Sequence, residues 1–176
     1  MSFFRGRLPA ALLCICILVI PVQLHAGTGI GVEGGVAVPL VHGNGTPYML
    51  GATFKTDKFP FIVSGRLQLN GSQLSAGGMN VDMWLDDIQI GYSVFNFYYG
   101  PGITVLYHTE VDTDDFEQSK GIFVAPRVFA GMSSMLTSFA ELYMQAAVEP
   151  GVVFDEADGF IFRMNLPLTA GLRFWF

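Results

Sequence analysis

The stretch "LTAGLRFWF", residues 168–176, ends the chain and decides how the rest of the sequence is interpreted. Counting back from the last residue, the even positions are all apolar: Phe160, Phe162, Met164, Leu166, Leu168, Ala170, Leu172, Phe174 and Phe176. The odd positions between them are mostly small, polar or charged. A period of two places successive side chains on opposite faces of a β-strand. The alternation therefore predicts one long strand over residues 160–176.

The length of this strand separates two classes of protein. Strands in soluble sheets usually have about five or six residues, whereas a tilted membrane-spanning strand needs roughly nine to eleven. The alternative, an edge strand of a soluble sandwich, would require a second sheet to cover the whole apolar face. We therefore expect a transmembrane strand with lipid on the Phe and Leu side.

The N-terminus, "MSFFRGRLPAALLCICILVIPVQLHA", has the layout of a secretory signal peptide. Arg5 and Arg7 precede an apolar core from Leu8 to Ile20, and the small residue Ala26 stands at a plausible cleavage point. We expect residues 1–26 to be removed and residues 27–176 to form one outer-membrane domain.

Two other interpretations of the N-terminus are weaker. A transmembrane helix is disfavoured because the apolar run is short and is interrupted by Pro9 and Pro21. A lipoprotein anchor at Cys16 is disfavoured because more apolar residues follow that cysteine. Cys14 and Cys16 are the only cysteines, so the mature chain would have no disulfide, thiol chemistry or cysteine metal site.

The composition describes an apolar but acidic chain. Hydrophobic residues make up 51% of it and the formal net charge is −6, which argues against a nucleic-acid surface. After the leader, no apolar run is long enough for a spanning helix. The high hydropathy therefore needs another explanation.

Alternating segments along the whole chain explain the high hydropathy. Seven further segments show the period of two, at residues 29–40, 47–55, 59–70, 87–94, 95–108, 121–132 and 139–149. Together with the last strand they predict an all-β fold, an antiparallel eight-stranded transmembrane up-and-down β-barrel. The apolar parity switches within "VDMWLDD", residues 81–87, which predicts a β-bulge or a strand that begins above the membrane.

The connections between these segments also differ in length and polarity. Residues 56–58, 94–96 and 133–136 are short, whereas 70–80 and 109–119 are longer and polar, and 155–159 is acidic. Short turns on one side and longer loops on the other are typical of outer-membrane barrels. Only the connection at 41–46 is shorter than expected.

The face opposite the lipid carries charged side chains of both signs. An eight-stranded barrel is just wide enough for side chains to fill it, and unpaired buried charges are costly. We therefore predict a salt-bridged lumen without a wide aqueous pore, built from Glu33, Lys55, Arg66, Asp87, Arg127, Glu141, Glu149, Arg163 and Arg173.

The end of the chain resembles a known assembly signal. Thr169, Gly171, Phe174 and Phe176 resemble the C-terminal β-signal that the barrel-assembly machinery recognises in outer-membrane proteins. The mature chain resembles the small eight-stranded bacterial outer-membrane β-barrels of the OmpX, OmpA-barrel and OmpW kind. This resemblance implies location in the bacterial outer membrane, contact with outer-membrane lipid and assembly by that machinery.

Candidate chemistry is sparse. His108 is followed by Thr109 and Glu110, but adjacent strand residues point to opposite faces, and the spacing matches no acyl-transfer motif. We interpret His108 as a polar residue at the rim, and find no role for His42. The acidic run at 112–117 lacks the glycine and spacing of a calcium loop. We expect no catalytic residue, metal site or cofactor.

Three functional hypotheses remain. The favoured one is a structural or surface-interaction barrel whose loops at 70–80 and 109–119 contact host molecules, lipopolysaccharide or neighbouring cells. The second is a narrow conduit for small apolar compounds, as the OmpW resemblance implies, with Phe123, Phe129 and Tyr143 facing inward. The third, a lipid-modifying membrane enzyme, lacks a catalytic constellation.

Overall fold

The computed structural model describes residues 27–42, 45–89, 95–112, 118–155 and 159–176. The predicted signal peptide, residues 1–26, lies outside them. Strands are the regular elements of the described chain, in the order β1 (Thr28–Val41), β2 (Tyr48–Thr56), β3 (Phe59–Asn70), β4 (Gln73–Met83), β5 (Asp86–Gln89), β6 (Asn96–Asp112), β7 (Gln118–Met135), β8 (Ala140–Asp155) and β9 (Gly159–Trp175). No helix within these residues is long and apolar enough to cross a membrane.

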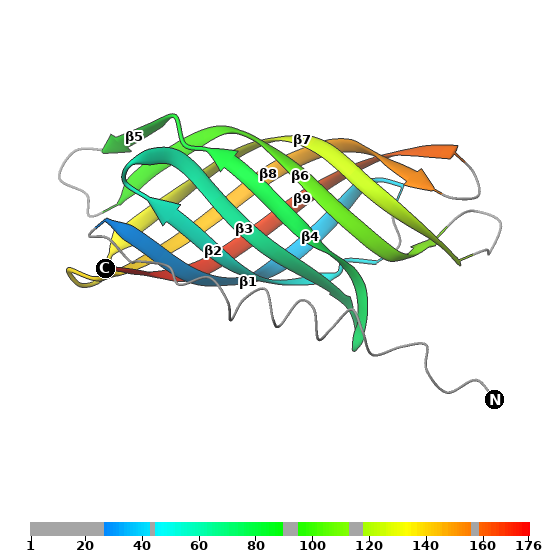
Figure 1. Ribbon diagram of the computed structural model, residues 1–176, viewed down its shortest axis with the longest axis horizontal. Helices are drawn as coiled ribbons and strands as arrows, with labels where there is room; N and C mark the ends of the chain where they lie inside the picture. The colour runs from blue at the N-terminus through cyan, green and yellow to red at the C-terminus, as the bar shows by residue number, and fades with distance from the viewer. Residues whose placement is uncertain (1–26, 43–44, 90–94, 113–117, 156–158) are drawn as a thin grey trace.

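The strands form a closed antiparallel barrel. Each strand pairs with its neighbours in the order β4-β3-β2-β1-β9-β8-β7-β6, and pairing of β4 with β6 completes the circle. This confirms the predicted eight-stranded barrel. The short β5 pairs only with β6, at the end of the barrel that also holds the C-terminus (Figure 1). Closure leaves the eight main strands without a free edge.

The closing seam explains why the chain ends on an ordered aromatic run. β9 pairs with β1 from Gly29 opposite Trp175 onward. At the last residue, the Gly27 amide donates to the Phe176 carbonyl oxygen at 2.7 Å, and the Phe176 amide donates to the Thr28 carbonyl oxygen at 2.9 Å. The terminal residues thus complete the β-ladder of the barrel.

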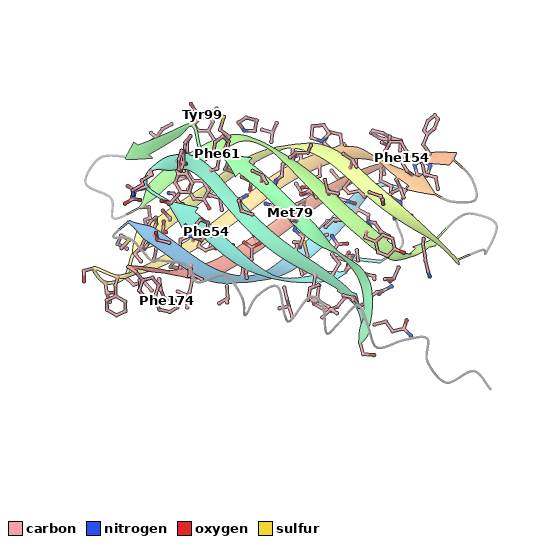
Figure 2. The ribbon with its side chains drawn as sticks, viewed as in Figure 1. Phe54, Phe61, Met79, Tyr99, Phe154 and Phe174 are labelled. Atoms are coloured by element: carbon pink, nitrogen blue, oxygen red, sulfur yellow. The ribbon has the colours of Figure 1, made fainter. Side chains whose placement is uncertain are left out.

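The period of two separates an apolar outside from a polar inside. Large apolar side chains are exposed around the barrel, including those labelled in Figure 2: Phe54, Phe61, Met79, Tyr99, Phe154 and Phe174. The buried side chains include many polar and charged residues, among them Thr53, Arg66, Asp82, Arg127, Glu149 and Arg173. Apolar exposed residues and buried charges are the reverse of a soluble protein.

The fourth barrel strand differs from the prediction. It is β4, residues 73–83, and not residues 87–94. Of that predicted segment, residues 87–89 belong to β5 and residues 90–94 lie outside the described residues. The predicted loop at 70–80 is therefore wrong, because β3 and β4 are joined by a tight turn in which Gly71 has φ 61°. Ser75 and Gly77 stand at outward positions of β4, where apolar residues would have shown the alternation. Backbone hydrogen bonds to the neighbouring strands nevertheless form the strand.

The parity switch between β4 and β5 is a β-bulge, as one of the two interpretations predicted. Asp82 pairs with Gly102 and Asp86 with Tyr99, so the β4–β5 side contains one extra residue. At the bulge, the Trp84 amide donates to the Pro60 carbonyl oxygen at 2.6 Å. The side chain of Trp84 is buried inside the barrel.

Two of the connections differ from the prediction, one in length and one in position. β6 continues to Asp112 and β7 begins at Gln118, so most of the predicted loop at 109–119 is strand and only 113–117 lie outside the described residues. β7 likewise runs to Met135, and the turn comes later, where the Leu136 amide donates to the Ala140 carbonyl oxygen at 2.8 Å. The predicted short turn at 56–58 is confirmed between β2 and β3.

Candidate functional site: the barrel lumen

A charged cluster, which we call the central network, fills the middle of the lumen. Glu149 on β8 accepts hydrogen bonds from Arg66 Nη1 at 3.0 Å and from Thr104 Oγ1 at 2.9 Å, and it forms an ion pair with Arg127 Nη1 at 3.2 Å. Arg127 Nε also contacts Asp82 Oδ1 at 3.1 Å. The four ionised side chains are at most 3% exposed. In a low-dielectric interior such charges persist only when they are paired and hydrogen-bonded.

Asp82 is the member of the central network that sequence reasoning missed. Besides Arg127, it accepts from Asn80 Nδ2 at 3.1 Å and from Gln145 Nε2 at 3.2 Å. The residue lies on β4, a segment that the sequence pattern predicts as loop and bulge. The sequence does indicate an inward position for Asp82, because this residue alternates with the apolar Val81 and Met83.

A second group, the lower network, lies toward the end that holds the C-terminus. Arg173 Nη1 donates to Glu141 Oε2 at 2.8 Å, and the Trp175 indole donates to the same oxygen at 3.0 Å. The guanidinium of Arg173 also lies 4.6 Å from the ring centroid of Tyr143. The Tyr143 hydroxyl in turn donates to Glu33 Oε2 at 3.0 Å. These contacts connect β1, β8 and β9 across the seam.

The bulge adds an aromatic stack to the lower lumen. The Trp84 ring stacks on Tyr98 at a centroid distance of 4.0 Å, and Lys55 Nζ lies 3.2 Å from the Trp84 centroid. A cation over the face of an indole ring is attracted by the ring's quadrupole. Trp84 and Tyr98 form a buried cluster with Ile62, Phe129 and Ala147.

Inward-facing glycines make room for these large side chains. A Cβ added at Gly171 would lie 2.6 Å from Tyr143 Cζ, and one added at Gly131 would lie 2.5 Å from Tyr98 Cζ. Such distances leave no space for a methyl group. Gly171 of the proposed β-signal therefore also has a packing role in the folded barrel.

The outer part of the lumen, near the β6–β9 tips, is apolar. Its buried cluster, called the outer cluster here, consists of Ala76, Leu106, Phe123, Ala125 and Val153, and each is 0% exposed. On β7, Phe123 lies farther than Arg127 from the end of the barrel that holds the C-terminus. On β8, Val153 lies farther than Glu149 from that end. A layer of apolar side chains therefore covers the central network on its outer side.

His108 lies beside the outer cluster instead of at an exposed rim. It is 7% exposed, and its ring meets Phe123 edge to face at 6.1 Å. Thr109 points the other way, since its hydroxyl donates to the Leu74 carbonyl oxygen at 2.7 Å. The two residues thus face opposite sides, as the strand geometry predicts. The side chain of Glu110 is outside the described part, and His42 is exposed.

The other predicted lumen residues are placed as follows. Lys55 lies over Trp84, and Arg163 is half-buried on β9, whereas the side chain of Asp87 on β5 is not among those described. Within the described residues, no group of three or more His, Cys, Asp or Glu side chains could hold a metal ion.

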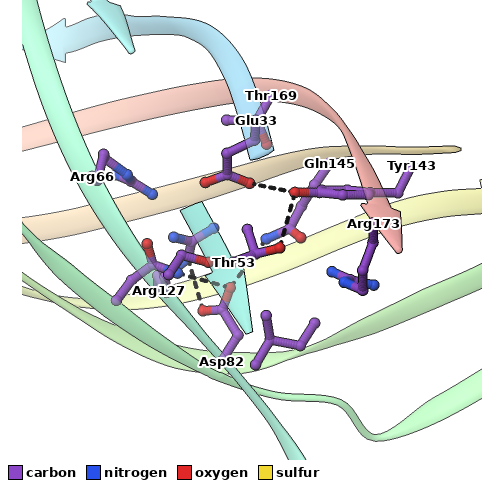
Figure 3. A pocket seen from close by; sticks show the side chains of 12 residues that line it. Glu33, Thr53, Arg66, Asp82, Arg127, Tyr143, Gln145, Thr169 and Arg173 are labelled. Carbon is purple, nitrogen blue, oxygen red and sulfur yellow. Dashed lines mark hydrogen bonds and ion pairs between the residues drawn. The ribbon is translucent and has the colours of Figure 1, made fainter. Parts of the chain in front are cut away.

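The space left between the two networks is small. A cavity of about 10 Å³ lies between the central and lower networks. Figure 3 shows the side chains that line it. Its wall includes Glu33, Thr53, Asp82, Arg127 and Tyr143. This volume is about what one water molecule requires.

Comparison with known proteins supports the fold. No protein-family model matches the chain, and no curated protein matches it. Among solved structures, Neisserial surface protein A is similar over 86% of this chain and 98% of its own, with 15% identity and a TM-score of 0.57. The N-terminal β-barrel domain of Pseudomonas aeruginosa OprF matches over 86% of this chain and 100% of its own, with 11% identity and a TM-score of 0.48. A major outer membrane protein of Thermus thermophilus gives a TM-score of 0.34 at 14% identity, covering 85% of this chain and 99% of that one.

Proposed function

We propose that this chain, which has the fold of the small eight-stranded outer-membrane barrels, is an integral protein of the bacterial outer membrane with a lumen sealed by its own side chains. Its role is then structural or surface-interacting, and it neither conducts ions nor catalyses a reaction. The observation that carries the proposal is the group of buried ion pairs in the lumen, beside which lies a cavity of about 10 Å³.

The outer surface supports residence in a bilayer. Along β9, Phe160 and Phe162 stand at one end and Phe174 at the other, with aliphatic outward residues between them. β2 repeats this arrangement from Tyr48 to Phe54. Aromatic girdles on both sides of an apolar band about 25 Å tall are characteristic of membrane β-barrels. In Figure 2, Phe154 and Phe174 lie near opposite ends of the barrel.

Two barriers of different chemistry support the sealed lumen. Ions would have to displace the guanidinium groups of Arg66 and Arg127 from Glu149, which would leave buried charges without partners. Water and ions would also have to cross the hydrocarbon of the outer cluster. Either barrier alone opposes the passage of ions.

The conduit for small apolar compounds is a second candidate because the outer cluster gives the lumen an apolar outer section. The close packing of Leu106, Phe123 and Val153, each 0% exposed, weighs against it, since a compound would have to displace these side chains. Contacts with partners would instead be made at the outer end, around the tips of β6–β9. The tight β3–β4 turn leaves the predicted loop at 70–80 no part in them.

Cysteine labelling tests membrane insertion and the seal together, because residues 27–176 contain no cysteine. We would refold that segment in lipid vesicles as Ser64→Cys, Leu67→Cys and Asp57→Cys, which place a thiol in the lumen, on the outward face and in a turn. A water-soluble maleimide should label only the turn, whereas a lipid-soluble maleimide should label Leu67→Cys.

Fast labelling of Ser64→Cys by the water-soluble reagent would contradict the sealed lumen. Fast labelling of Leu67→Cys by it would contradict the membrane-embedded outer face. Heat-modifiable migration of each variant on gels serves as the control for folding.

A further inference from the structure

His108 is a buried titratable side chain that belongs to neither of the two charged networks. It lies on β6 toward the outer end of the barrel, is 7% exposed, and meets Phe123 edge to face. Within the described part of the chain, its Nε2 atom has no hydrogen-bond partner. Most buried polar atoms in folded proteins have such a partner, so the placement of this imidazole needs an explanation.

The strand register shows what surrounds the imidazole. His108 pairs with Ala76 on β4 and with Gly121 on β7, and Ala76 pairs in turn with Gln68 on β3. All of these residues are buried, and Phe123 follows on the same face of β7. On β3, β4 and β7 the imidazole therefore adjoins side chains without charge.

The charged groups that face His108 lie on β6, β8 and β9. Arg163 on β9 is half-buried, and its positive charge acts on the imidazole. Glu110 on β6 and Asp155 on β8 stand at inward positions closer to the outer end, and their side chains are outside the described part. An imidazolium at the present position of His108 would thus face a guanidinium beside an apolar cluster, which is unfavourable.

The neutral and the charged imidazole therefore favour different positions. The neutral ring packs against Phe123 in the outer section of the lumen. The charged ring is more stable in water, and β6 ends at Asp112, so that His108 is close to the aqueous end of the barrel. Histidine ordinarily changes its charge between about pH 5 and about pH 8, and its protonation rearranges interfaces in known pH sensors.

We propose that His108 is an acid-sensitive switch of the outer cluster, whose protonation moves the imidazole toward water and admits water as far as the central network. The inference rests on the sealed lumen of the proposed function and adds a regulation to it. The ion pairs of Glu149 with Arg66 and Arg127 do not involve His108, so the deeper barrier stays closed. Acid then hydrates the outer section without opening a channel.

Cysteine labelling at two pH values tests this switch. Residues 27–176 would be refolded in lipid nanodiscs, where both ends of the barrel meet the solution, as Ala76→Cys, Ser64→Cys and Asp57→Cys. Ala76 belongs to the outer cluster, Ser64 lines the cavity between the two networks, and Asp57 lies in the β2–β3 turn.

Labelling of Ala76→Cys by a water-soluble maleimide is measured relative to labelling of Asp57→Cys at the same pH. We expect this ratio to rise about tenfold from about pH 8 to about pH 4.5, because one additional bound proton shifts an equilibrium by up to about tenfold per pH unit. Ser64→Cys should be labelled slowly at both pH values.

Matched variants in the Ala76→Cys background separate His108 from other acid-sensitive groups. His108→Gln keeps a polar side chain that takes up no proton, so labelling should stay slow at both pH values. The double variant Glu110→Gln, Asp155→Asn should leave the rise intact. Heat-modifiable migration shows that each variant is folded. A rise that survives His108→Gln, or that the double variant abolishes, would overturn the role of His108.

The remaining outcomes separate this inference from the proposed function. Slow labelling of Ala76→Cys at both pH values would overturn the switch and leave the sealed lumen standing. Fast labelling of Ser64→Cys at acidic pH alone would overturn the claim that the deeper barrier stays closed. Fast labelling of Ser64→Cys at both pH values would overturn the sealed lumen itself.

Discussion

Glu149 joins β8 to three strands through its carboxylate, which accepts hydrogen bonds from Arg66 on β3 and Thr104 on β6 and forms an ion pair with Arg127 on β7. Removing this carboxylate takes an anionic partner away from two buried guanidinium groups. Removing the threonine hydroxyl loses only one hydrogen bond. We therefore expect Glu149→Ala to lower the free energy of unfolding by about 3–5 kcal/mol and Thr104→Val by about 1 kcal/mol. Urea titration in lipid vesicles measures both. Equal destabilisation of the two variants would contradict the assigned importance of the ion pairs.

The residues of the lumen could be predicted as a set but not as pairs. Arg66, Arg127 and Glu149 follow from strand parity, because an odd or even position fixes the face. Their partners depend on register and shear between strands, which the alternation of a single strand does not contain. Asp82 was missed because its strand was misassigned, and the role of the whole charged set as a seal stays a prediction.

At the scale of the element, β9 both closes the barrel and carries the residues that resemble the β-signal. Gly171→Ala would place a methyl group 2.5 Å from the Val32 carbonyl oxygen and 2.6 Å from Tyr143 Cζ. We expect a loss of about 1–3 kcal/mol in the free energy of unfolding, the usual cost of overpacking. Gly65→Ala on β3 is the matched control, because its added Cβ would meet nothing within 4 Å. Urea titration monitored by heat-modifiable migration compares them.

Tyr143→Ala should relieve the crowding, so the double variant should lose less than the sum of the two single variants. Strict additivity would show that the glycine is required for another reason. The same experiment separates the packing role of Gly171 from its resemblance to an assembly signal, since refolding in vesicles takes place without the assembly machinery.

The sequence predicted best those strands in which one face is apolar along its length and the other carries mostly polar or small residues. β3 and β9 alternate without interruption, and their predicted bounds, 59–70 and 160–176, agree with the structure to within one residue. β8 was predicted to end at residue 149 and continues to Asp155. β4 could not be found in the same way, because Ser75, Gly77 and Gly78 offer no apolar parity. Its place is fixed by hydrogen bonds to β3 and β6, which are long-range interactions. The tips of β6 and β7, residues 109–112 and 118–119, were interpreted as loop for the related reason that most of their residues are polar.

On the scale of the whole molecule, the fold is a barrel with apolar residues outside and charges inside. The apolar exterior supports insertion into a bilayer, and the filled interior supports a closed lumen. Together they support the proposal that this protein, unlike a porin, has no water-filled channel. The fold by itself does not assign a function, so the distinction must be tested at the lumen.

Single-channel recording in planar bilayers tests the sealed lumen most directly. Residues 27–176 would be refolded, verified by heat-modifiable migration, and inserted under voltage. We predict a folded barrel that produces no discrete current steps, because ions would have to pass the paired charges of the central network and the apolar side chains of the outer cluster. Reproducible conductance steps from the folded protein would contradict the sealed lumen and favour a conduit.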